Sequence, residues 1–298
     1  MNFVRRNGNP HVSRYAKPAT VDEALALLAE GPWRVLAGGT DFYPALGAKP
    51  LLEDVLDVGK LDGLRGISET SDHIVIGART TWTDIVRATL PPAFDALKQA
   101  AREVGSVQIQ NRATIAGNLC NASPAADGVP ALMVLDAEVE LRSSRAKRTL
   151  PLGDFILGNR KTARAQDELV TAICIPKTST TGASSFYKLG ARRYLVISIA
   201  MAAAQIVVED GKVQRAAVAV GACSAVAQRL SAVETALTER DADASLAYLV
   251  QADMLAGLSP IDDVRGSAGY RRDAALEIVR RAIAGALGAN ARTAERAA

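Results

Sequence analysis

Apolar and polar residues in the first third of the chain follow a helical period in some segments and an extended period in others. Thr20 stands three residues before Glu23 in a capping-box pattern, and alanines and leucines at helical spacing follow, so we predict a helix over 20–28. Residues 33–36 form a strand-like run that soon reaches a glycine pair. The same reasoning predicts short strands at 54–58 and 73–78 and helices at 83–87 and 94–104.

The middle of the chain has a weaker pattern. Residues 106–127 are polar and small and follow neither period, which predicts a loop region. Residues 133–141 and 168–175 read as strands, and Pro176 ends the second. The Thr- and Ser-rich stretch at 177–186 predicts a linker.

Beyond this stretch the pattern changes to two long apolar strands followed by helices. The strands are predicted at 197–208 and 213–220, joined by Glu209-Asp210-Gly211-Lys212, a good hairpin signal. Leu276, Val279, Ile283 and Leu287 recur at helical spacing near the end of the chain, which indicates a helix that buries one face. The predicted helices are 227–237, 242–256 and 270–287.

These elements predict an α+β protein of more than one folding unit, as a length of 298 residues also suggests. We expect a mixed unit over 1–176, divided into 1–50 and 51–176, and a smaller unit of antiparallel sheet plus helices over 187–290. Residues 291–298 are assigned to a tail.

Composition narrows the classes of function. Aromatic residues make up 4% of the chain, too few for a surface that stacks nucleic-acid bases, so no nucleic-acid partner is expected. The net charge is only +3, but basic residues concentrate between Arg142 and Arg164, where Asp154 is the sole acid. This segment fits a solvated loop, a subunit contact or a contact with a phosphate-rich partner.

Cysteine and histidine usage predicts that the chain holds no metal of its own. The three cysteines and two histidines are widely separated, and their spacing is not typical of zinc or iron–sulfur ligands. They are Cys120, Cys174, Cys223, His11 and His73. No apolar leader and no apolar run of membrane-spanning length is evident, so we expect a soluble cytoplasmic protein with no membrane span.

Two small-residue loops carry the candidate chemistry. In 35–42 a strand runs into Gly38-Gly39, and glycine lets backbone N–H groups approach an anion closely. Residues 111–118 offer a second loop with hydroxyl and amide donors. Each loop alone is an ordinary turn, whereas the pair suits a diphosphate, and neither matches the Rossmann or P-loop motif.

The order of these loops and the residues around them resemble a known family. The matching segments are 15–24, 37–41, 111–118, 122–127, 155–162, 167–170 and 186–193. Together they resemble the FAD-binding medium subunits of the xanthine dehydrogenase and carbon monoxide dehydrogenase family of molybdenum hydroxylases. The resemblance implies a two-part FAD-binding domain of the vanillyl-alcohol oxidase/CO dehydrogenase flavoprotein type, followed by a smaller α+β C-terminal domain.

The resemblance also implies a cofactor site. Backbone N–H groups of Gly38, Gly39 and Thr40 in the first loop, with Thr114, Gly117 and Asn118 in the second, would hold the pyrophosphate and ribityl region. The other cofactor-binding positions of the first loop would be Leu36, Ala37, Asp41 and Phe42. Asp127 would accept hydrogen bonds from sugar or ribityl hydroxyls, and Leu169 and Val170 would pack near the isoalloxazine. Lys188 would lie near the pyrimidine end, where a cation stabilises negative charge on the reduced ring.

The implied function is electron transfer by non-covalently bound FAD. Electrons would arrive from [2Fe–2S] clusters on a small partner subunit, a large subunit would hold the molybdenum cofactor, and NAD⁺, oxygen or another acceptor would take the electrons. Two alternatives stay open: a self-sufficient FAD-dependent oxidase or dehydrogenase, and a flavin-free assembly protein of the same fold. The first needs its own catalytic acid or base, and the spacing of residues offers no such constellation.

Overall fold

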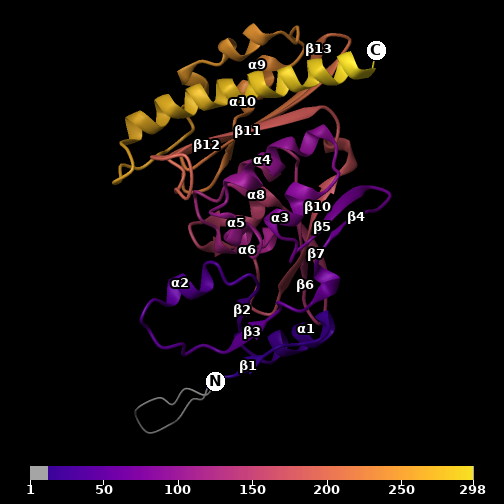
Figure 1. Cartoon of the computed structure of the whole chain (residues 1–298), viewed down its shortest axis with the longest axis vertical. Coiled ribbons are helices and arrows are strands. Elements are labelled where there is room, and N and C mark those ends of the chain that lie inside the picture. The colour runs from indigo at the N-terminus through magenta and orange to yellow at the C-terminus, as the bar shows by residue number, and fades with distance from the viewer. Residues whose placement is uncertain (1–12, 298) are drawn as a thin grey trace.

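The computed structural model describes residues 13–297, so His11 and the N-terminal segment searched for a leader lie outside it. Three units are stacked along the long axis of the molecule in Figure 1. A small parallel sheet lies at one end, an antiparallel sheet with several helices occupies the middle, and a second antiparallel sheet with one long helix lies at the other end.

The first unit is a three-stranded parallel sheet with one covering helix. Its strands, in the order β1-β3-β2, are Tyr15–Ala16, Val55–Asp57 and Arg34–Leu36. Helix α1 spans Val21–Glu30, and the Thr20 hydroxyl accepts a hydrogen bond from the Glu23 N–H at 3.1 Å, so the predicted capped helix is confirmed. A short helix, α2 (Phe42–Leu46), follows β2.

The middle unit is a five-stranded antiparallel sheet with helices packed beside it. Its strands, in the order β4-β5-β10-β6-β7, are Ile67–Glu69, His73–Gly77, Leu169–Pro176, Glu138–Arg142 and Lys147–Pro151. A two-stranded ribbon lies beside them, with β8 at Ile156–Gly158 and β9 at Lys161–Thr162. The helices are α3 (Trp82–Arg87), α4 (Asp95–Glu103), α5 (Val107–Gln110), α6 (Ile115–Asn121), α7 (Gly128–Met133) and α8 (Leu152–Phe155), with single 3₁₀ turns η1 (Asp62–Leu64) and η2 (Pro92–Phe94).

Two predictions in this unit are wrong. Residues 106–127, expected to be a loop, contain α5 and α6, because Ser106 and Thr114 cap helices too short to show a period. The strand predicted at 133–141 begins only at Glu138. The residues before it close α7 and turn at Asp136, whose φ is +49°.

The C-terminal unit is a four-stranded antiparallel sheet, β11 (Ala183–Leu189), β12 (Ala200–Glu209), β13 (Lys212–Gly221) and β14 (Gln228–Arg229). The predicted hairpin is confirmed, since Glu209 pairs with Lys212 across the turn. Helix α10, Ala268–Ala297, includes the predicted helix and continues to Ala297, so the described part of the predicted tail is helical. The stretch predicted as a linker holds a 3₁₀ turn, η3 (Lys177–Ser179), and the first residues of β11.

Two predicted helices in this unit are partly or wholly wrong. Residues 227–237 begin with β14 and become helical only in α9 (Ser231–Leu237), because β14 pairs with β13. Residues 242–256 form two 3₁₀ helices, η4 (Ala244–Leu249) and η5 (Ala252–Leu255), in place of one α-helix. The extended backbone of Val250 and Gln251 separates the two.

The C-terminal sheet is buried on both faces, which joins this unit to the middle one. Met201 and Ala203 of β12 belong to the core of the middle unit, whereas Ala202 and Ala204 pack under α10. This alternation is the ordinary period of a strand, and small side chains let both layers approach closely. No helix within residues 13–297 has the length and apolar character that crossing a bilayer requires.

We expect Gly182→Ala to destabilise the protein more than Gly211→Ala. Both glycines have positive φ, at +71° and +75°, so both substitutions introduce similar backbone strain. Only at Gly182 would the new Cβ clash, lying 2.2 Å from the Ile206 carbonyl oxygen. Urea denaturation should therefore show an additional loss of roughly 1–3 kcal/mol for Gly182→Ala, the usual range for overpacking. Equal losses would show that β11 moves away without cost.

Candidate functional site

A cleft of about 830 Å³ lies where the three units meet, a volume within the range of cofactor pockets. The structure brings most of the predicted site residues into its wall, namely Ala37, Gly38, Gly39, Thr40, Asp41, Phe42, Thr114, Gly117, Asn118, Asp127, Leu169 and Val170. Leu36 and Lys188 do not line the cleft and lie buried behind its surface. In Figure 1, β2 and α2 stand on one side of this region, and α5 and α6 on the other.

The first glycine loop presents a row of backbone donors. It connects β2 to α2, and Gly39 has φ +80°, a conformation that favours glycine. Within residues 13–297, the N–H groups of Gly38, Gly39, Thr40 and Asp41 donate to no protein acceptor. Successive free N–H groups of this kind form a concave site for an anion.

The two loops pack directly against each other at Gly38. A Cβ on this residue would lie 2.0 Å from the Arg112 carbonyl oxygen, so backbone meets backbone with no room for a side chain. At Gly39 the nearest atom to a Cβ would be in the Tyr43 ring, at 2.8 Å, which is a side chain that can move. Glycine is therefore required at position 38 because the two loops approach too closely for a side chain, and at position 39 because its φ is positive.

The second loop uses its amides internally. The Thr114 hydroxyl caps α6 by accepting a hydrogen bond from the Gly117 N–H at 3.1 Å, and the Asn118 N–H donates to the Thr114 carbonyl oxygen at 3.1 Å. These two N–H groups already have acceptors, in contrast to the expectation that they hold a pyrophosphate. What this loop offers is the Asn118 side chain, whose buried Oδ1 has no hydrogen-bond partner among the described residues.

Asp127 and Lys188 form a buried ion pair at the end of the cleft. Lys188 Nζ donates to Asp127 Oδ2 at 2.7 Å, and Ser198 Oγ donates to Oδ1 at 2.7 Å. The side chains of Asp127 and Lys188 are less than a tenth exposed. Burial raises the pKa of Asp127, and the ammonium of Lys188 opposes that rise. Lys188 therefore reaches the cleft through Asp127 rather than directly.

Four arginines line the cleft and were not predicted as site residues, namely Arg34, Arg79, Arg160 and Arg164. Arg79 donates to the Gly59 carbonyl oxygen, and Arg160 donates to Asn121 Oδ1 at 2.9 Å. Arg164 donates to the Glu168 carbonyl oxygen at 2.7 Å. Arg34 and Arg79 also form ion pairs, with Glu53 and Asp62. Arg160 and Arg164 are held by neutral oxygens, which leaves the positive charge of these two available to an anion.

Two of these arginines, Arg160 and Arg164, belong to the basic segment from Arg142 to Arg164, whose concentration of charge is visible in the sequence. Its earlier members are neutralised by carboxylates, in the pairs Arg142–Asp22, Arg145–Asp167, Lys147–Glu140 and Arg148–Glu168. Its later members, Arg160 and Arg164, line the cleft. The segment is therefore an ion-paired surface at one end and part of the candidate site at the other.

The C-terminal unit supplies an apolar wall that the sequence did not predict. Leu195, Val196 and Ile197, in the loop between β11 and β12, line the cleft. Leu195 and Ile197 are more than half exposed, and Leu195 has φ +51°. Exposed aliphatic side chains at the edge of a cleft provide a surface on which a flat apolar ring can lie.

Among residues 13–297, no group of three or more His, Cys, Asp and Glu side chains is placed to hold a metal ion. Trp82, fully buried in the cleft wall, has an indole N–H without a partner among these residues. The site thus combines free N–H donors, arginines and apolar walls.

Comparison with known proteins identifies the family. Residues 10–178 match the family model described as FAD binding domain in molybdopterin dehydrogenase. Residues 185–286 match CO dehydrogenase flavoprotein C-terminal domain. The chain belongs to the FAD-binding subunits of the molybdenum hydroxylase family. It is an oxidoreductase subunit, and both the resemblance and the two-domain α+β fold expected from the sequence are confirmed.

Similar proteins cover between two thirds and nearly the whole length of this FAD-binding subunit. The nicotine 6-hydroxylase medium subunit of Paenarthrobacter nicotinovorans is 30% identical over 276 residues, covering 91% of this chain and 95% of the relative. The nicotinate dehydrogenase FAD-subunit of Eubacterium barkeri is 38% identical over 204 residues, or 66% of this chain and 69% of the relative. The carbon monoxide dehydrogenase structure from Hydrogenophaga pseudoflava matches with a TM-score of 0.83 and 28% identity, covering 93% of this chain and 98% of that one.

We expect Lys188→Met to destabilise this FAD-binding subunit more at pH 8 than at pH 5. Without the ammonium, the pKa of buried Asp127 rises further above its unfolded value, so stability is lost as the pH increases and the carboxyl must ionise. Breaking a buried pair typically costs about 3–5 kcal/mol, and this loss should be seen at pH 8. Urea denaturation at both pH values measures it.

The double variant Lys188→Met/Asp127→Asn is the control. Because it leaves no buried charge at this position, it should recover much of the stability and lose the added pH dependence. A loss that is equal at pH 5 and pH 8 for Lys188→Met would contradict the argument.

Proposed function

We propose that this chain binds one FAD non-covalently in the cleft and transfers electrons between [2Fe–2S] clusters of a partner subunit and a terminal acceptor. The observation that carries the proposal is the row of four free N–H groups in the first glycine loop, inside a cleft of about 830 Å³. When bound, FAD supplies the redox chemistry. The chain's own residues bind it, orient it and limit its contact with water.

The phosphate end is assigned to the first loop. The N–H groups of Gly38, Gly39, Thr40 and Asp41 would donate to the diphosphate, and nearby guanidinium groups would balance its charge. Phe42 follows this loop, and its ring is covered by the Arg34 guanidinium at 4.4 Å, which fixes both side chains. Leu36 and Ala37 support the loop from the end of β2.

The ring end is assigned to the apolar walls. Leu169 and Val170 at the start of β10 would pack on one side, and residues 195–197 would supply a second apolar surface. Asp127 retains capacity to accept a hydroxyl of the cofactor, because each carboxylate oxygen can accept more than one hydrogen bond. Lys188 would act by keeping this carboxylate ionised and in place.

The assembly is inferred from the relatives. Their names include the terms medium subunit, FAD-subunit and medium chain, which describe parts of larger enzymes. We propose that this chain likewise works with an iron–sulfur small subunit and a large subunit that holds the molybdenum cofactor. The acceptor, whether NAD⁺, oxygen or another molecule, and a cytoplasmic location remain expectations from the sequence.

The chain should purify with a flavin that is released as FAD on denaturation. The proposed site contains a row of donors at one end and apolar walls at the other, which suits a dinucleotide with a diphosphate better than a single phosphate ester. Chromatography of the released flavin distinguishes FAD from FMN. Finding FMN, or no flavin under conditions that saturate with FAD, would contradict the proposal. Substrate-dependent bleaching by the chain alone would favour a self-sufficient oxidase.

Gly39→Val should weaken FAD binding by more than tenfold, because a β-branched side chain resists the positive φ that sets the backbone course of this loop in the cleft wall. Gly47→Val is the matched control, since Gly47 also has positive φ, lies at the end of α2 and has open space around its Cβ position. Titration of the apoprotein with FAD measures both. Equal weakening in the two variants would show that the first loop has only a structural role.

A further inference from the structure

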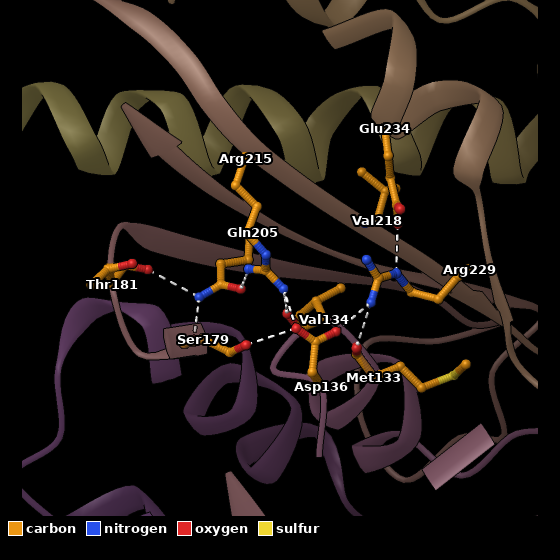
Figure 2. A network of polar contacts seen from close by, with 10 residues as sticks. All are labelled: Met133, Val134, Asp136, Ser179, Thr181, Gln205, Arg215, Val218, Arg229 and Glu234. Atoms are coloured by element: carbon orange, nitrogen blue, oxygen red, sulfur yellow. Dashed lines mark hydrogen bonds and ion pairs between the residues drawn. The ribbon is translucent and has the colours of Figure 1, made fainter. Parts of the chain in front are cut away.

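Asp136 lies outside the cleft, on the turn between α7 and β6. Its φ of +49° is uncommon for a residue other than glycine, although Asp and Asn tolerate it best. The turn points its carboxylate toward the C-terminal unit, as Figure 2 shows. Asp136 thus has a strained backbone conformation at a position where its side chain contacts the C-terminal unit.

Three side chains of other segments donate to this carboxylate (Figure 2). Ser179 Oγ and Arg215 Nη2 reach Oδ2 at 2.7 and 2.5 Å, and Arg229 Nη1 reaches Oδ1 at 2.8 Å. Arg215 belongs to β13 and Arg229 to β14, both in the C-terminal sheet. The two guanidinium groups and the hydroxyl lower the pKa of Asp136, against the effect of burial.

Each arginine in this network is itself fixed. Arg215 donates to Gln205 Oε1 at 2.6 Å, and the amide of Gln205 donates to the Ser179 carbonyl oxygen at 2.7 Å. Arg229 donates to Glu234 at 2.5 Å and to the Met133 carbonyl oxygen, at the end of α7, at 3.0 Å. Gln205 and Glu234, both in the C-terminal unit, therefore orient the two guanidinium groups toward Asp136, which reduces the entropy lost on pairing.

The opposite end of α7 is attached to the same sheet. Asp127, the residue before α7, pairs with Lys188 of β11 and accepts from Ser198, just before β12. Between these two attachments α7 packs closely, since a Cβ on Gly221 of β13 would lie 3.0 Å from the Pro130 ring. The short α7 segment is thus held at both ends by aspartates, one in the cleft wall and one outside it.

The loop that carries the apolar wall at 195–197 connects β11 to β12, next to the residues that contact Asp127. Lys188 lies before the loop in β11, and Ser198 lies directly after the wall residues. The distance between this wall and the first glycine loop therefore depends on how the C-terminal sheet sits on α7. The contacts of Asp127 fix the sheet at one end of α7, and the contacts of Asp136 fix it at the other end.

We propose that Asp136 is a positioning residue: through Arg215 and Arg229 it fixes the C-terminal sheet on α7 and so sets the apolar wall at 195–197 against the bound cofactor. This inference rests on the proposed FAD site. It adds that the geometry of this site is controlled by charges outside the cleft. The Asp136 side chain is 43% exposed, whereas that of Asp127 is 9% exposed. Dissolved salt therefore screens the ion pairs of Asp136 with the arginines much more than the ion pair of Asp127 with Lys188.

The test uses the full chain loaded with FAD and the variant Asp136→Asn, which keeps a residue suited to positive φ and removes the charge. Glu277→Gln is the control, since it removes the same charge from an exposed ion pair with Arg281 on α10. The measurements are the FAD dissociation constant at low and high salt, the visible circular dichroism of the flavin and its midpoint potential.

We expect Asp136→Asn to weaken FAD binding at least fivefold at low salt and to alter the dichroism and the potential, with Glu277→Gln unchanged. High salt should weaken binding by the wild-type chain more than by Asp136→Asn, whose network is already broken. If Asp136→Asn fails to fold, Arg215→Gln, which removes only one of the two cations at this carboxylate, provides the same comparison.

Two outcomes would overturn the inference in different ways. A lower melting temperature for Asp136→Asn with unchanged FAD affinity, dichroism and potential would show that the network only stabilises the fold. Failure of the wild-type chain to bind FAD would overturn the proposed function, and this inference with it.

Discussion

The ion pair between Asp127 and Lys188 is the interaction on which the rest of the arrangement depends. Its two charges come from different units and lie almost completely out of water, so neither is stable there without the other. The C-terminal unit must therefore dock before the cleft has its complete wall. Docking of the C-terminal unit thus completes both this ion pair and the wall of the cleft.

Much of the fold could be predicted because the relevant signals are local. The capping box at Thr20, the hairpin at 209–212 and the helical stripe that ends at Leu287 each depend on neighbouring residues. Some of the errors arose where distant contacts decide the conformation. Residues 228–229 are extended because β13 lies beside them, and the turn at Asp136 is stabilised by arginines far away in the sequence.

The candidate site was predictable only in part, for a related reason. The glycine loops could be found because a short motif dictates their backbone, and the family resemblance led to the proposal that they bind the cofactor. The arginine at 79 and the apolar residues at 195–197 carry no motif, and only the fold brings them to the cleft. The motif also did not show that Thr114 caps α6 and so occupies the N–H of Gly117.

The free N–H groups at Gly38 to Asp41 have a consequence for how this site tolerates change. A ligand held by hydrogen bonds from backbone N–H groups depends little on which side chains those residues carry, provided the backbone conformation is kept. If the proposed site is correct, the positions after the glycine pair can vary in charge and size while the backbone N–H groups keep their place. Natural variation or engineering would then alter the surroundings of the cofactor at these positions without removing the donors.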